Sequence, residues 1–213
     1  VGGLAMTNDP ELAVMLRSLA NHGRDAIYLS MDDDKVEDAT KLGMIMERRF
    51  NFVRMGYSYR ATEMEAALGL AQVEEASQNL ARRRSNAQFL LAHLRRWEKY
   101  LQLPSVMPKA EHSFMMFPLV VKDAGIVRDE LTLFLEQRNI ETRYMLPLTN
   151  QPYNQELFGA NLEERFPVAK FINHHGFYIG CHPDLSAEEL QYVGDVFNEF
   201  FEEYEKRGSM RRE

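Results

Sequence analysis

Cysteine is almost absent from this chain of 213 residues, because Cys181 is the only one. A single thiol excludes an intrachain disulfide and a cysteine-rich zinc site, and it is typical of a protein in a reducing compartment. No run of residues approaches the ~18 consecutive apolar positions of a membrane-spanning helix, and the first residues lack the pattern of a signal peptide. We therefore expect a cytoplasmic protein.

Positive charge is also in short supply. The chain has 25 Lys and Arg residues against 32 Asp and Glu residues, which gives a formal net charge of −7. Without a basic field, binding of a polyanion by counterion release is disfavoured, and we expect no nucleic-acid partner. Hydrophobic residues make up 45% of the sequence, enough to fill the core of one large domain or two modest ones.

Several common catalytic motifs are missing: the sequence has no G-x-x-x-x-G-K-[ST], G-x-G-x-x-G, G-x-S-x-G or H-E-x-x-H. The adjacent pair His174 and His175 is a weak metal candidate, because neighbouring side chains on a helix or strand point in different directions. We interpret the pair as the end of a helix, where a cation near the last carbonyls is favourable. We interpret Cys181 as a packing residue, not a nucleophile.

Helix-capping signals are clear at three places. Asp9 followed by Pro10 predicts a helix start, with Gly23 as its stop. Capping boxes at Thr62 to Glu65 and Ser186 to Glu189 predict two more. The second helix is expected to run from about 63 to 97, with a kink or break near Gly69 or Ser77. The last carries an apolar stripe from Leu190 to Tyr204 at helical spacing.

The remaining segments alternate between strands and helices after Pro104. We expect a short strand at 3–7 and mostly irregular structure over 24–55. Further strands are predicted at 114–121, 140–145 and 177–180, with a helix at 129–138. Pro118 lacks a backbone donor and therefore predicts an edge position or a bulge for the first of these strands. The class is α/β.

One string carries a resemblance to a known family. Residues 56–69, GYSYRATEMEAALG, resemble the GYNYRMTELQAALG signature of DegT-type sugar-nucleotide aminotransferases. Three more strings are similar to family patterns in the same order, so the resemblance covers residues 1 to about 204. They are GGLAMTND at 2–9, IETR with PL and QPY at 140–153, and FYIGCHPDLSAEELQYV at 177–193.

The resemblance implies the C-terminal part of a fold type I transferase that depends on pyridoxal 5′-phosphate (PLP). Residues 1–60 would be the tail of the large PLP-binding domain with an interface loop, 61–103 a long connecting helix, and 104–213 a small α/β domain with a short, mainly antiparallel sheet. The reaction it implies moves an amino group from glutamate to a keto sugar linked to a nucleotide. The family forms homodimers in which this loop helps to build the neighbouring subunit's PLP site.

The family's Schiff-base lysine precedes the strand with which this chain opens, and none of the seven lysines present stands in that context. We therefore expect that lysine upstream of Val1, no catalytic residue within these 213 positions, and no activity from this chain alone. A histidine in its place would indicate the family's sugar dehydrase branch. A non-catalytic regulatory homologue and an independent interaction module are further alternatives.

Four residues are candidate ligand contacts. Ser58, where relatives usually have Asn, would donate a hydrogen bond to the phosphate of the partner subunit's PLP. Arg60 would bind a phosphate or carboxylate, with a structural role at the helix start as the alternative. Arg143 would meet a substrate anion or form a structural ion pair. His182 would lie near the substrate or pack in a loop.

Overall fold

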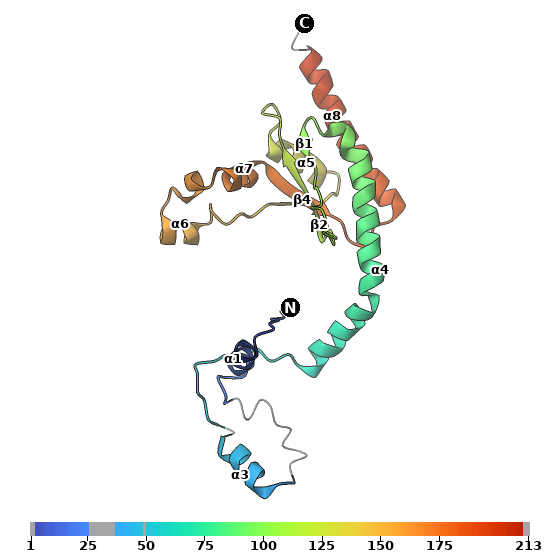
Figure 1. Cartoon of the computed structure of the whole chain (residues 1–213). Coiled ribbons are helices and arrows are strands. Elements are labelled where there is room, and N and C mark those ends of the chain that lie inside the picture. Colours follow the sequence, from blue (N-terminus) through green and yellow to red (C-terminus); the bar gives the residue numbers. More distant parts are fainter. Residues whose placement is uncertain (1–2, 26–36, 49, 211–213) are drawn as a thin grey trace. The chain divides into compact units, whose positions relative to one another are not determined.

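The computed structural model describes residues 3–25, 37–48 and 50–210, and Figure 1 labels its elements. The chain forms two compact units, Val1–Val73 and Glu74–Glu213. The predicted boundaries after residues 60 and 103 stay a prediction. Within the described part of the chain, no helix is both long and apolar enough to cross a membrane.

The first unit begins with α1, Pro10–Ala20, and the predicted start is confirmed because the Asp9 side chain accepts hydrogen bonds from the amides of Glu11 and Leu12. The expected strand at 3–7 is wrong: no described segment pairs with it, and Leu4 and Met6 are each 86% exposed. An unpaired extended segment is not a strand.

The prediction of mostly irregular structure over 24–55 is wrong for α3, Ala39–Arg48. This helix begins after Asp38, whose carboxylate accepts hydrogen bonds from the amides of Thr40 and Lys41. Residues 26–36 and 49, which the same prediction covered, lie outside the described residues.

The long helix is α4, Glu63–Leu94, and a 3-10 turn, η2, Arg95–Trp97, extends it. Its predicted capping box is confirmed: the Thr62 amide donates to Glu65 Oε2 at 2.8 Å, and the Glu65 amide donates to Thr62 Oγ1 at 3.2 Å. The helix is continuous through Gly69 and Ser77, so the predicted break is wrong, while the kink stays a prediction.

The second unit is built on an antiparallel sheet with the strand order β1-β2-β4-β3. The strands are β1, Leu101–Gln102; β2, Met116–Val121; β3, Thr142–Tyr144; and β4, Gly176–Gly180. Although β2 is not an edge strand, β1 pairs only with its residues Val120 and Val121. Pro118 pairs with Tyr178 of β4 but lies beyond the pairing with β1. The strand as a whole is therefore not an edge strand, but Pro118 holds an edge position on the β1 side, where its missing N–H costs no hydrogen bond.

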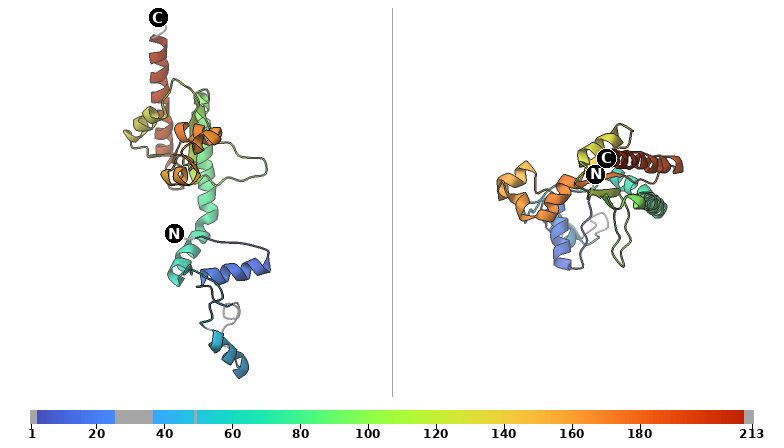
Figure 2. Two further views of the ribbon diagram at one scale, coloured as in Figure 1. Left: turned by 90° about the vertical axis from the view of Figure 1, so that its left-hand side faces the viewer. Right: turned by 90° about the horizontal axis from the view of Figure 1, so that it is seen from above.

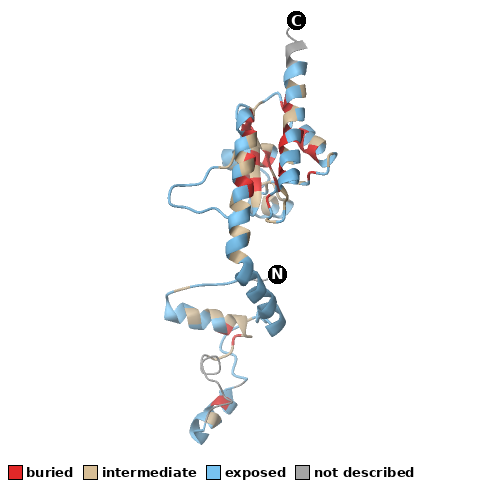
Figure 3. Ribbon diagram, turned by 90° about the vertical axis from the view of Figure 1, so that its right-hand side faces the viewer, coloured by how far each residue is buried: buried red, intermediate tan, exposed pale blue. Residues whose placement is uncertain are grey.

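The second unit also contains α5, Arg128–Glu136; α6, Pro152–Phe158; α7, Pro167–His175; and α8, Ala187–Met210, with a 3-10 turn, η3, Leu162–Arg165. Of these, α5 and α7 contact strands of the sheet, whereas α6 packs against η3 and lies away from the sheet (Figure 1). Inward residues of β2 and β4 meet apolar residues of α5, α8 and the last turns of α4 in one core. Figure 2 shows α8 alongside those turns of α4, and Figure 3 shows the buried residues gathered between these helices and the sheet.

Candidate functional site

The loop from Gly56 to Arg60 is fixed to the C-terminal end of α1 by backbone hydrogen bonds. The Tyr57 amide donates to Leu19 O at 2.7 Å and the Tyr59 amide donates to Ala20 O at 2.9 Å, while the His22 amide donates to Tyr57 O at 2.8 Å. These bonds satisfy carbonyls that a helix end leaves without partners. The loop is therefore held in one conformation although its side chains are exposed.

Two glycines allow the loop to lie so close to the chain that follows α1. Gly23 has a φ of +78°, and a Cβ atom on Gly56 would lie 2.1 Å from the backbone nitrogen of Gly23. Because the contacting atoms are backbone, no side-chain rotation would relieve the overlap. The glycine that opens the GYSYR string is therefore required by the close crossing of two chain segments.

Ser58 and Arg60 present hydrogen-bond donors from this fixed loop. Tyr57 and Tyr59 stack with their ring centroids 5.0 Å apart, and the alternation of an extended segment directs Ser58 and Arg60 to the other side. Among the described residues, the Ser58 hydroxyl has no hydrogen-bond partner. Arg60 Nη1 donates to Asn21 Oδ1 at 2.8 Å and lies 2.5 Å from His22 Nε2.

These donors fit a phosphate group. A hydroxyl without a partner and a guanidinium that still has donors on Nε and Nη2 are suited to an anion with several acceptor oxygens. The bonds of Arg60 go to the residues that follow α1 and not to the start of α4, and a structural role at this junction stays the alternative to ligand binding. The loop therefore has the chemistry that the PLP phosphate would require.

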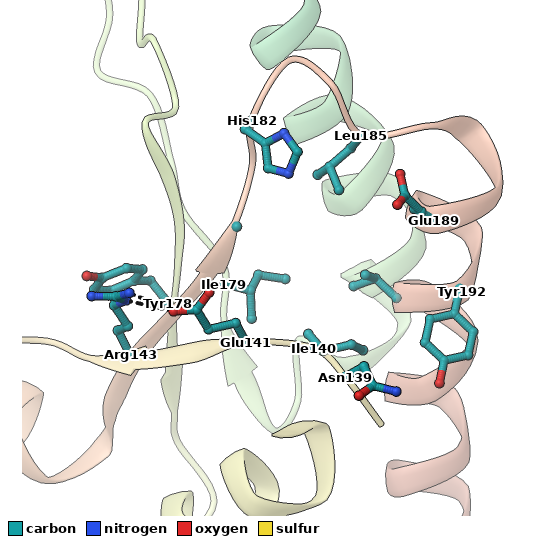
Figure 4. Close-up of a pocket in the computed structure, with 12 residues that line it drawn as sticks. Asn139, Ile140, Glu141, Arg143, Tyr178, Ile179, His182, Leu185, Glu189 and Tyr192 are labelled. Atoms are coloured by element: carbon teal, nitrogen blue, oxygen red, sulfur yellow. Dashed lines mark hydrogen bonds and ion pairs between the residues drawn. The ribbon is translucent and has the colours of Figure 1, made fainter. Parts of the chain in front are cut away.

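Arg143 and His182 lie in the second unit, beside a cavity of about 350 Å³ between β3, β4 and the first turns of α8 (Figure 4). Its floor is apolar and its rim is polar. The floor residues are Ile140, Ile179, Leu185 and Val193; the polar rim residues include Glu141, Arg143, His182, Glu189 and Tyr192.

Arg143 is paired with Glu141 across two residues of chain. Its Nη2 lies 2.6 Å from Glu141 Oε1, and this hydrogen bond raises the pKa of the guanidinium. The side chains are 66% and 72% exposed, so water screens the pair and it contributes little to stability. Such a pair can open for a substrate anion, and its presence also fits the alternative of a structural ion pair.

His182 is exposed at the mouth of the cavity, on the connection between β4 and α8. Glu189, on the opposite rim, belongs to the predicted capping box, because the Ser186 amide donates to Glu189 Oε2 at 2.8 Å. This bond is the main reason why the pKa of the Glu189 carboxyl is lowered. The rim therefore carries a fixed negative charge near neutral pH.

The structure places the other candidates in structural roles. His175 Nδ1 lies 2.9 Å from Phe171 O at the end of α7, and His174 Nε2 lies 3.2 Å from Glu163 Oε2. Over residues 3–25, 37–48 and 50–210, the His, Cys, Asp and Glu side chains form no group of three that could hold a metal ion. Cys181 is buried, and burial raises the pKa of its thiol to about 11, which fits a packing role.

The structure thus brings the four predicted residues together as two pairs, Ser58 with Arg60 in the first unit and Arg143 with His182 in the second. It also reveals Asn86, which the sequence analysis missed. Asn86 is buried on α4, and its Nδ2 donates to His182 O at 2.8 Å. No local pattern could have found it, since the two residues are 96 positions apart.

Comparison with known proteins gives a family match over most of the chain. The model of the DegT/DnrJ/EryC1/StrS aminotransferase family matches residues 1–198. Lipopolysaccharide biosynthesis protein RfbH of Salmonella typhimurium is 30% identical over 208 residues, which cover 94% of this chain and 47% of the relative. The dTDP-4-dehydro-2,6-dideoxy-D-glucose 3-dehydratase of Saccharopolyspora spinosa is 28% identical over 207 residues, 93% of this chain and 44% of the relative.

A similar fold is found among solved structures. The aminotransferase from Psychrobacter cryohalolentis superposes with a TM-score of 0.73 at 21% identity, over 92% of this chain and 50% of that chain. This likeness confirms the predicted α/β fold of a fold type I transferase. The chain spans about half the length of the relatives that it matches.

Proposed function

The chain belongs to the DegT/DnrJ/EryC1/StrS aminotransferase family, and from this premise we propose that it forms part of a PLP-dependent aminotransferase. The proposed reaction transfers an amino group from glutamate to a keto carbon of a nucleotide-linked sugar. One observation supports it most directly: the family's junction loop presents the Ser58 hydroxyl and the Arg60 guanidinium from a backbone fixed on α1.

Each predicted site residue has a proposed task. Ser58 donates a hydrogen bond to the PLP phosphate of the partner subunit, and Arg60 binds an anionic group of cofactor or substrate. Arg143 releases the Glu141 carboxylate and binds a substrate anion in its place. His182 contacts the substrate at the mouth of the cavity. The bound cofactor supplies the electron sink for the reaction.

A homodimer is part of the proposal. The first turns of α4 expose Met64, Leu68, Leu70 and Val73, each by 62–79% of its surface. Burial of such side chains contributes roughly 25 cal/mol per Å², which favours an interface over exposure to water. We also propose a cytoplasmic location, on the grounds of the single, buried cysteine.

A sugar 3-dehydratase is the second candidate, favoured by the relative of that activity at 28% identity. The residue at the family's Schiff-base position, a few residues upstream of Val1 in the coding sequence, separates the two candidates. Lysine at that place supports amino transfer, and histidine supports dehydration. Any other residue at that position, together with substrate binding but no substrate turnover, would indicate the non-catalytic regulatory homologue.

The test uses the longest polypeptide that the reading frame encodes, purified with PLP. We expect a dimer by light scattering, and amino transfer from glutamate in a screen of nucleotide-linked keto sugars. Ser58→Ala and Arg60→Ala should each weaken PLP or substrate binding about tenfold, the effect of one lost hydrogen bond to a charged group.

Arg17→Ala is the matched control, because Arg17 is an exposed arginine on α1 outside the loop. A PLP-saturated monomer would contradict the dimer and the role of Ser58 across the interface. If Arg60→Ala lowered the melting temperature while the folded fraction bound normally, Arg60 would be structural.

A further inference from the structure

The connection between β4 and α8, residues 181–186, is held in place by one turn of α4. Asn86 Nδ2 donates to His182 O at 2.8 Å, and Arg83 Nη1 donates to Cys181 O at 3.4 Å. Arg83 and Asn86 are three positions apart, so they lie on the same face of the helix. Both residues therefore point at consecutive carbonyls of the same loop.

A third hydrogen bond is donated by the loop and accepted by α4. The Cys181 thiol donates to Arg83 O at 3.5 Å, and it remains protonated because burial raises its pKa to about 11. The capping box of Ser186 and Glu189 fixes the far end of the connection. His182 is thus exposed in its side chain while the backbone on each side of it is anchored.

We propose that Asn86 is a positioning residue that holds the His182 ring at the mouth of the cavity. This inference rests on the proposed function, in which His182 contacts the substrate. A loop without such anchors samples many conformations, and a binding group is effective only when it is held within roughly 0.5 Å of its working position. Asn86 does this from a buried site, where water does not compete for the carbonyl.

The experiment is a double-mutant cycle between Asn86 and His182 in the full-length, PLP-loaded protein. UDP, GDP, CDP and dTDP are titrated one at a time by calorimetry, and the tightest binder is used as the probe. We expect His182→Ala to raise its Kd about tenfold and Asn86→Ala to raise it about threefold to tenfold. In the His182→Ala background, Asn86→Ala should change the Kd by less than about twofold, because the ring that Asn86 positions is gone.

Two further variants guard against a general loss of stability. Asn86→Asp keeps the size of the side chain but removes the amide donor, and it should reproduce the effect of Asn86→Ala. Asn198→Ala is the matched control: Asn198 is a partly buried asparagine of the same unit that accepts a hydrogen bond from Trp97 Nε1 at 2.8 Å. It should leave the Kd unchanged.

The outcomes separate the inference from the function on which it rests. If none of the four nucleotides binds the wild-type protein, the proposed function and the inference both fail. If a nucleotide binds and His182→Ala has no effect, the inference is overturned while the nucleotide-sugar function stands. If the effects of Asn86→Ala and His182→Ala simply add, or Asn198→Ala weakens binding equally, Asn86 only supports the fold.

Discussion

Replacement of Gly56 by alanine should detach the junction loop from α1. The new Cβ atom would lie 2.1 Å from the Gly23 nitrogen, where real Cβ contacts are not shorter than 3.0 Å, so the two segments must separate by at least the difference, 0.9 Å. Such a shift carries the bond from the Tyr57 amide to Leu19 O, now 2.7 Å, past hydrogen-bonding distance.

The equivalent of two backbone bonds would be lost, and each contributes about 0.5–1.5 kcal/mol. We therefore expect a loss of about 1–3 kcal/mol in the local opening free energy. Amide hydrogen exchange measures it directly: protection at His22, Tyr57 and Tyr59 should fall by roughly tenfold to a hundredfold. Weaker PLP retention should accompany this change, because Ser58 is carried by the same loop.

Gly69→Ala is the matched control. A Cβ atom at Gly69 meets nothing within 4 Å, and the position lies inside α4. There the same substitution should stabilise the helix by about 0.5–1 kcal/mol. Unchanged protection at the loop amides in Gly56→Ala would refute the close crossing and the reasoning built on it.

Three more predictions concern the second unit. Phe201→Ala should lower the free energy of unfolding by about 3–5 kcal/mol in a urea titration, because Phe201 is fully buried, whereas Phe158→Ala at a 60% exposed site should cost far less. Burial raises the pKa of the Cys181 thiol to about 11 from an ordinary 9.0. At pH 8 it should therefore react with iodoacetamide about a hundredfold more slowly than a free thiol, because only the thiolate reacts. A rate equal to that of a free thiol would contradict the burial of Cys181. The pKa of Glu189 is lowered from 4.5 by the hydrogen bond from the Ser186 amide. The free energy of unfolding of the wild type should therefore exceed that of Glu189→Gln above about pH 4.5, and the difference should vanish as the pH falls through the lowered pKa. A difference that is independent of pH would count against the capping role.

The elements that the sequence predicted well are those encoded by neighbouring residues. The caps at Asp9, Thr62 and Ser186 are formed by side chains that reach backbone groups two or three positions away, and all three helix starts are confirmed. The strands at Phe117 and Ile179 were found because the segments are apolar and rich in β-forming residues.

The elements that were missed or misjudged depend on partners. Leu4 and Met6 have strand-like composition but no neighbouring strand among the described residues, and β1 is a strand of only two residues that exists through its pairing with β2. Whether Pro118 has a strand neighbour on each side was decided by the register of the sheet, since β1 pairs only with Val120 and Val121 and ends before it reaches Pro118. None of these outcomes could be predicted from a few neighbouring residues of the sequence.

The sequence by itself determined the family, the helix starts and the identity of the four candidate ligand contacts, because motifs and caps are local. The tertiary structure alone decided how those contacts are held: the crossing of Gly23 and Gly56 behind Ser58, and the bond from Asn86 to the carbonyl of His182, 96 residues away. The physical reason is that backbone groups buried away from water must find partners, and the fold decides which distant residues supply them.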